Sequence, residues 1–212
     1  MIYPDQGEIY KAAEKKHAAL VFFVHFYQGN KKALRRHIQF VNSLGYDAYA
    51  FNLKDKIKDH YGLPYSLISK KFGLKHAMAD QIEEHLDLLK NYPQKIIYSF
   101  SNVSACAIEA LARRKPFDIE GLITDSGPSF NFLTSAYNLY THSIKISFLP
   151  LRLAATPLLA FGWSPELHKH IREDLRKLPE GFRILSIRGW KDPLIKPGDI
   201  DLVFEPCKNL QW

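Results

Sequence analysis

A serine lies at the junction between an apolar run and a helical pattern, in the segment Ser99-Phe100-Ser101-Asn102-Val103. A serine on a tight strand-to-helix turn keeps its Oγ exposed at the positive end of the helix. The backbone N–H of Asn102 can then point at a developing oxyanion, which makes Ser101 a candidate nucleophile. The usual pattern is G-x-S-x-G, and here Ser99 and Val103 replace the glycines. Taken alone, the segment is better explained by a serine that caps the helix.

Two other segments with polar residues follow apolar runs. Residues 25–29 (HFYQG) follow the first run, and residues 189–195 (GWKDPLI) follow the last one. Asp192, in a tight turn of the second segment, is well placed to orient a histidine. Asp125 is a second candidate acid, but its Asp-Ser-Gly-Pro context is more typical of a side chain that binds loop backbone.

These segments need a scaffold that brings them together, and the hydrophobic pattern predicts one. Short apolar runs are typical of strands buried on both faces, and they are found at 18–25, 47–53, 94–100, 119–124 and 183–188. Helical spacing is found at 31–44, 76–91, 102–114 and 165–178, whereas 54–75 is expected to be mostly loop. The alternation predicts an α/β fold with a mostly parallel central sheet and helices on both faces. The ends of parallel strands share one edge, so the three segments are expected to meet there.

One connection, between the runs that end at 124 and begin at 183, is much longer than the others. Connections of this length are usually lids or inserted subdomains, so we expect a single domain over 1–212 with a helical cap at about 128–180. The alternative is a cap that only completes the core. The apolar stretch 144–163 contains Lys145, Arg152, Pro150 and Pro157, which favours a buried or interfacial segment over a transmembrane span.

Four segments carry a resemblance to a known family: HFYQG at 25–29, SFSNVSA at 99–105, ITDSGP at 123–128 and GWKDPLI at 189–195. With them the chain, over about 18–195, resembles the α/β-hydrolase superfamily, and it looks most like the poorly characterised branch that includes transmembrane protein 53. The resemblance implies an α/β-hydrolase fold with Ser101 as nucleophile and Asp192 as triad acid. It also implies an oxyanion hole formed by the N–H groups of Tyr27 and Asn102.

The same resemblance implies a catalytic histidine after a further helix and strand. Residues 209–212 look like the start of that strand, so the histidine and the rest of the last strand and helix are expected beyond Trp212. Of the nine histidines present, His25 is expected to shape the oxyanion loop and to contact substrate together with Phe26. The weaker candidates for a base are the cap histidines His142, His168 and His170.

The expected activity is that of a serine hydrolase, similar to an esterase, lipase or thioesterase, acting on a hydrophobic ester or acyl substrate without a cofactor. An elbow serine without its base is a weak nucleophile, so the alternative is a non-catalytic α/β-hydrolase-fold protein that binds a lipid or a partner protein. No C-x-x-C, H-E-x-x-H, G-x-x-x-x-G-K-[ST] or G-x-G-x-x-G pattern occurs, which argues against a metal site and a nucleotide cofactor.

The composition indicates which kinds of binding partner and which cellular compartment to expect. The net charge of +7 favours acidic partners, but no nucleic-acid module is recognisable. Basic clusters at 31–32, 35–36, 70–71 and 113–115 are expected mainly to be solvated, with contact to anionic lipid as the alternative. Two cysteines and an N-terminal segment without an apolar core are typical of a cytoplasmic protein. The sequence does not indicate the oligomeric state.

Overall fold

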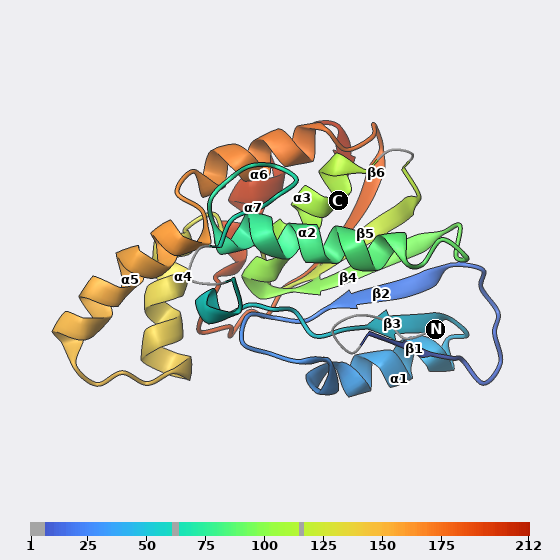
Figure 1. Cartoon of the computed structure of the whole chain (residues 1–212), viewed down its shortest axis with the longest axis horizontal. Coiled ribbons are helices and arrows are strands. Elements are labelled where there is room, and N and C mark those ends of the chain that lie inside the picture. Colours follow the sequence, from blue (N-terminus) through green and yellow to red (C-terminus); the bar gives the residue numbers. More distant parts are fainter. Residues whose placement is uncertain (1–6, 61–63, 115–116) are drawn as a thin grey trace.

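The residues that the structure describes form a seven-stranded sheet with the strand order β1-β3-β2-β4-β5-β6-β7. The computed structural model describes residues 7–60, 64–114 and 117–212 (Figure 1). Within this sheet β1 pairs antiparallel with β3, and the other neighbouring strands that the structure describes pair parallel. The strands are β1 (Glu8–Tyr10), β2 (Leu20–Val24), β3 (Asp47–Ala50), β4 (Lys95–Phe100), β5 (Ile119–Asp125), β6 (Phe182–Ile187) and β7 (Leu210–Gln211).

Helices cover both faces of this sheet, as the sequence predicts. On one face α1 packs against the apolar residues of β2 and β3, and on the other face α2, α3, α6 and α7 form the larger core. The α-helices are α1 (Arg35–Ser43), α2 (Leu74–Asp87), α3 (Ser104–Arg113), α4 (Phe132–Asn138), α5 (Leu149–Trp163), α6 (Leu167–Arg176) and α7 (Pro197–Phe204). Shorter helical turns are η2 (Lys31–Leu34), η3 (Ile57–His60), η4 (Ser101–Val103) and η5 (Leu139–Ser143).

Strand β2 shows why its sequence is apolar without alternation. It lies between β3 and β4, and all five of its residues are buried. A strand covered on both faces by helices needs apolar side chains at every position. The register then aligns the strand ends: Val24 pairs with Ser99, Ser99 with Thr124, and Thr124 with Ser186. The segments that follow β2, β4, β5 and β6 therefore leave the sheet at one edge.

Several elements differ from the sequence-based expectation. Strand β1 was not predicted, because three residues give too little periodicity. Helix α7 was implied by the family resemblance but was not located, because its eight residues give no clear periodicity. The cap expected at about 128–180 includes helix α6 within its bounds. Helix α6 places Leu167, Ile171 and Leu175 in the main core, so the projecting part ends near Trp163. Lys115, from the basic cluster at 113–115, lies outside the described residues.

A buried cluster of charges joins α2, α3 and α6. Lys75 is fully buried, and its Nζ lies 2.6 Å from Glu109 and 2.8 Å from Asp174. His76 Nδ1 is 2.6 Å from the same Glu109 carboxylate, which Arg113 also contacts. Arg113, from a basic cluster expected to be solvated, is thus half-buried in ion pairs. Burial alone would raise the pKa of Glu109, but these partners hold it well below its ordinary 4.5.

Helices α4 and α5 project from the sheet as a pair (Figure 1). We call residues 132–163, with η5 and the loop between them, the helical hairpin. Large exposed apolar side chains are concentrated on it: Leu133, Ile144, Phe148, Leu149, Leu151, Leu153, Leu158 and Phe161. None of the helices in the described ranges has the length and apolarity needed to cross a membrane.

The buried cluster gives a first prediction. Glu109→Gln leaves the Lys75 ammonium buried beside a single carboxylate, so we expect the free energy of unfolding to fall by about 3–5 kcal/mol at neutral pH. Because the pKa of Glu109 is lowered, its contribution is present above pH 4.5 and is lost as the pH falls below that value. Urea unfolding at neutral and acidic pH measures both effects.

The matched control is Glu84→Gln, an exposed position on the same helix as Lys75, which should change stability by less than about 0.5 kcal/mol. If both variants unfold alike, or if the Glu109 effect persists undiminished at acidic pH, the cluster does not stabilise the fold in the way described.

Candidate active site

Ser101 sits on a sharp turn between β4 and the helical segment η4–α3. Its φ is +57°, a left-handed backbone conformation that costs a residue with a side chain about 1–2 kcal/mol. The turn is held from both sides: Phe100 ends a buried strand, and Val103 is fully buried in the core. Val103 at a position usually held by glycine is therefore accommodated by packing. Ser99, which replaces the other glycine, donates from its Oγ to Ser104 Oγ at 2.9 Å.

Gly127 packs directly against this turn. A Cβ at Gly127 would lie 2.2 Å from the carbonyl oxygen of Ser101, so no other residue fits without moving the elbow. The Asn102 side chain ties the elbow to the start of the hairpin. Its Oδ1 accepts the Ser129 N–H at 2.9 Å, and its Nδ2 donates to Ser135 Oγ at 2.9 Å. The loop after β5 is thus fixed to the elbow by packing and by hydrogen bonds.

The loop after β2 forms the opposite wall. The N–H of Gly29 donates to the Phe26 carbonyl at 2.9 Å, which closes a turn with Tyr27 in it. The N–H of Gln28 donates to the Asp55 carboxylate, which is 4% exposed. Burial raises the pKa of Asp55, although the Gln28 N–H and nearby charges act against the rise. A buried carboxylate on loop backbone fixes the direction of this turn.

His25, expected to contact substrate, lies under the loop and is not among the residues that line the pocket, whereas Phe26 lines it. Its Nε2 accepts the N–H of Leu53 at 2.9 Å, and its Nδ1 lies 2.8 Å from the Phe26 carbonyl. The backbone donor assigns the tautomer, with the proton on Nδ1. Burial lowers the pKa of His25, in keeping with a neutral imidazole. The side chain shapes the loop, which was the other part of the expectation.

Two carboxylates reach the same region. Asp192 Oδ1 accepts the N–H groups of Leu194 at 2.7 Å and Ile195 at 3.2 Å, while Oδ2 has no hydrogen bond to the described residues. Asp125 uses both oxygens: Oδ2 lies 3.4 Å from the Tyr98 hydroxyl and Oδ1 3.2 Å from Ser126 Oγ. Asp192 thus keeps one oxygen available to a further donor.

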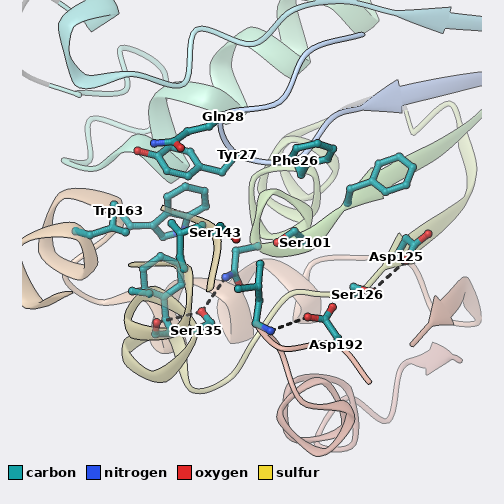
Figure 2. A pocket seen from close by; sticks show the side chains of 17 residues that line it. Phe26, Tyr27, Gln28, Ser101, Asp125, Ser126, Ser135, Ser143, Trp163 and Asp192 are labelled. Carbon is teal, nitrogen blue, oxygen red and sulfur yellow. Dashed lines mark hydrogen bonds between the residues drawn. The ribbon is translucent and has the colours of Figure 1, made fainter. Parts of the chain in front are cut away.

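These parts enclose a pocket of about 420 Å³. Figure 2 shows Ser101 between Phe26, Tyr27 and Gln28 on one side and Asp125, Ser126 and Asp192 on the other. The hairpin supplies the third wall, where Trp163 contacts Tyr27 edge-on at 5.6 Å and stacks on Phe132 at 5.2 Å. Most of the remaining lining is apolar: Phe100, Ala136, Leu139, Leu159 and Leu194.

The structure therefore brings together Ser101, Asn102, Tyr27, Phe26 and Asp192, all of which line this pocket. None of the histidines in the described ranges does so; His170 bonds to Ser164, and His168 contacts Phe130. In the same part of the chain no group of three or more His, Cys, Asp and Glu side chains could hold a metal ion.

Comparison with known proteins gives structural but no sequence matches. No family model matches the chain, and no curated protein matches its sequence. An esterase from Pyrococcus furiosus superposes with a TM-score of 0.65 at 18% identity, covering 96% of this chain and 73% of that one. A carboxyl esterase from Bacillus coagulans gives 0.61 at 15% identity, covering 96% and 81%. An alpha-beta hydrolase from Vibrio vulnificus gives 0.62 at 15% identity, covering 92% and 65%.

This chain has the α/β-hydrolase fold. The sheet order, the parallel pairing and the similarity to these solved structures agree on this point. Structural similarity at such low sequence identity shows the fold alone, and the reaction depends on the residues of the site. The finer resemblance, to the branch that includes transmembrane protein 53, stays a prediction.

Some residues of the site were not found from the sequence. Asp55 is distant in sequence from Gln28, whose N–H it accepts. It lies in the stretch 54–75, which was expected to be mostly loop, and no pattern there indicated a contact with the loop after β2. Gly127 belongs to the quoted ITDSGP motif, but its contact with Ser101 depends on two loops meeting. Trp163, Leu139 and Leu159 lay within the apolar cap, where a single sequence does not show which side faces the pocket.

The strained elbow gives a second prediction. Ser101→Gly should have a free energy of unfolding about 1 kcal/mol higher than Ser101→Ala, because glycine adopts a positive φ without strain. Both variants lack the hydroxyl, so the difference reports on the backbone alone. Chemical unfolding of the two proteins measures it.

Ser104 provides the control, because its backbone is helical (φ −56°). There the order should reverse, with Ser104→Gly less stable than Ser104→Ala by about 1 kcal/mol. If Ser101→Gly is less stable than Ser101→Ala, as expected for the pair at Ser104, then Ser101 does not have the left-handed conformation.

Proposed function

We propose that this chain is a serine hydrolase that cleaves esters or thioesters of hydrophobic acyl groups, with Ser101 as the nucleophile. The observation that carries the proposal is the left-handed Ser101 at the floor of a pocket that Asp192 also lines. Strained backbone of this kind is concentrated at functional sites. A serine that only capped the helix would need no positive φ.

In the proposed reaction Ser101 Oγ attacks the substrate carbonyl carbon and gives up its proton to a base. The tetrahedral oxyanion that forms is held by the backbone N–H groups of Asn102 and Tyr27. Asn102 follows Ser101 at the start of a helical turn, where N–H groups have no partner within the helix. Collapse expels the alcohol or thiol, which takes the proton, and water then releases the acid from the acyl-serine by the same steps.

Asp192 is the proposed acid. Its Oδ1 is fixed by two backbone N–H groups, and its Oδ2 can accept the N–H of an imidazole. Asp125 binds side-chain hydroxyl groups through both oxygens, which suits a carboxylate that holds the loop after β5.

The proposed base is a histidine that follows Trp212 in the chain. Strand β7 pairs parallel with β6, so chain that continues from β7 leaves the sheet at the edge where Asp192 lies. A histidine in that continuation would lie near both Asp192 and Ser101.

The pocket supports a hydrophobic substrate. Its volume of about 420 Å³ falls within the usual range for small-molecule sites, and its walls are mainly aromatic and aliphatic. The solved relatives in fold are described as esterases, in keeping with an ester as the substrate.

One observation favours a second function, a non-catalytic protein that binds a lipid or a partner in this pocket. Within the described ranges no histidine lines the pocket, so this part of the chain does not itself supply the base. A test of the nucleophile separates the two functions.

The third prediction concerns that nucleophile. A fluorophosphonate probe should label the protein expressed from its whole reading frame, and Ser101→Ala should abolish the labelling. The reason is that the probe phosphonylates only an activated hydroxyl. Gel fluorescence and mass spectrometry of the labelled peptide measure it. Ser143→Ala, which removes another serine of the pocket wall, should label like the unchanged protein.

Labelling that survives Ser101→Ala would refute the assignment of the nucleophile. A folded protein that is never labelled, while it still binds a fluorescent fatty acid in the pocket, would support the binding function.

The fourth prediction separates the two carboxylates. Asp192→Asn should lower kcat for p-nitrophenyl butyrate by about 10⁴-fold, because the base loses its orientation and its counter-charge. Asp125→Asn should cause a much smaller loss, since its carboxylate contacts only hydroxyl groups of the loop and of β4. Steady-state kinetics of both variants decide the point, and a larger loss for Asp125→Asn would reverse the assignment.

A further inference from the structure

We infer that the helical hairpin inserts into the surface of a lipid membrane that carries anionic headgroups. The outer side of α5 is the strongest unexplained surface of the molecule. Leu158 is 71% exposed and Phe161 60% exposed, although neither contributes to the pocket. The site described above gives no reason for large apolar side chains here.

The exposed side of α5 is broad and entirely apolar. Leu151 and Leu153 are 51% and 57% exposed, and positions two apart on an α-helix lie about 160° apart around its axis. Between them the exposed side chains are Ala154, Pro157, Leu158 and Phe161. A helix that is hydrophobic over most of its circumference requires an apolar environment on its outer side as well.

The polar groups of α5 are turned toward the hairpin itself. Arg152 Nη1 donates to Thr141 Oγ1 at 3.1 Å, and its guanidinium lies over the Tyr137 ring. Thr156 Oγ1 donates to the Arg152 carbonyl at 2.8 Å. The exposed side of α5 therefore offers no polar side chain to a partner. A protein interface normally has about one hydrogen bond per 100–200 Å², so a second copy of the chain fits this surface less well than lipid does.

The charge of the hairpin favours a membrane with anionic headgroups. No Asp or Glu occurs between Asp125 and Glu166, whereas Lys145 is exposed in the loop that joins η5 to α5. A lysine beside inserted apolar residues can place its ammonium among lipid phosphates. The chain as a whole carries a net charge of +7, which adds attraction to an anionic surface.

The geometry fits a helix that lies in the membrane surface. Helix α5 has 15 residues, fewer than the roughly 20 needed to cross the hydrocarbon core. It is anchored at its C-terminal end, where Ser164 Oγ lies 3.2 Å from His76 Nε2 and Phe161 contacts Phe72. The body of the protein can therefore stay in water while the outer side of the hairpin enters the interface.

The same helix forms the pocket wall through Leu159 and Trp163. Contact of its outer side with lipid places the pocket next to the membrane. The implied substrate class, an acyl ester resident in the membrane, rests on the proposed function, whereas the membrane contact itself does not.

The fifth prediction is tested by vesicle flotation in the Ser101→Ala background, so that catalysis plays no part. The protein should float with vesicles of phosphatidylcholine and phosphatidylserine, and more weakly with phosphatidylcholine alone. The double variant Leu153→Glu and Leu158→Glu should bind at least about tenfold less, because it places charge where apolar contact is needed. Leu202→Glu, at a position 47% exposed on α7, is the matched control and should bind normally. Thermal unfolding checks that both variants fold.

Three results would overturn the inference: no flotation of the parent protein, equal flotation of the double variant, or a lipid-free dimer that the double variant abolishes. With Ser101 restored, the double variant should hydrolyse a vesicle-embedded long-chain ester at least about tenfold more slowly, with turnover of a soluble short-chain ester unchanged. If no variant turns over the soluble ester, the proposed function fails while the flotation result still decides the membrane contact.

Discussion

A residue with a side chain keeps a positive φ only where its surroundings leave no other conformation. At Ser101 the surrounding structure restricts the backbone from three sides. Strand β4 enters the turn paired with β2 on one side and β5 on the other. The helix that leaves it is fixed in the core through Val103, and Gly127 closes the remaining side with its backbone. The site depends on this constraint, because it holds the Ser101 hydroxyl in the pocket and exposes the first N–H groups of the helix.

Much of this arrangement could be predicted from one sequence because it follows from short-range patterns. Fully apolar runs such as β2 are typical of central strands of a parallel sheet, and the common edge of these strands brings Ser101 and Asp192 to one pocket. The features that the sequence did not predict depend on contacts between residues far apart in the chain. His25 looked like a pocket residue, yet its ring nitrogens bind the backbone of Leu53 and Phe26. Strand β1 forms because it pairs with the edge of β3. Its three residues alone do not carry a pattern that predicts this pairing.

Buried charge was equally hidden from the sequence. Lys75 was expected at the end of a stretch that is mostly loop, but it lies in the first turn of α2, where its ammonium contacts Glu109 and Asp174 in the core. A buried ion pair rarely adds more stability than an apolar contact of the same size, yet it does not tolerate a missing partner. The cluster thus fixes how α2, α3 and α6 fit together. Through His76 and Ser164 it also fixes the end of α5.

The exposed side of the hairpin is not required by the packing below it. The core is closed by the body of the sheet and its helices, and α5 joins it chiefly through Trp163 at one end. Leucines such as Leu158 gain nothing from folding while they remain in water, and contiguous exposed apolar surface on a soluble protein usually marks an interaction site. The opposite side of the same helix forms the pocket wall through Leu159 and Trp163. The inferred membrane contact and the wall of the pocket therefore belong to two sides of one helix, and contact of the outer side with lipid brings the pocket close to the membrane.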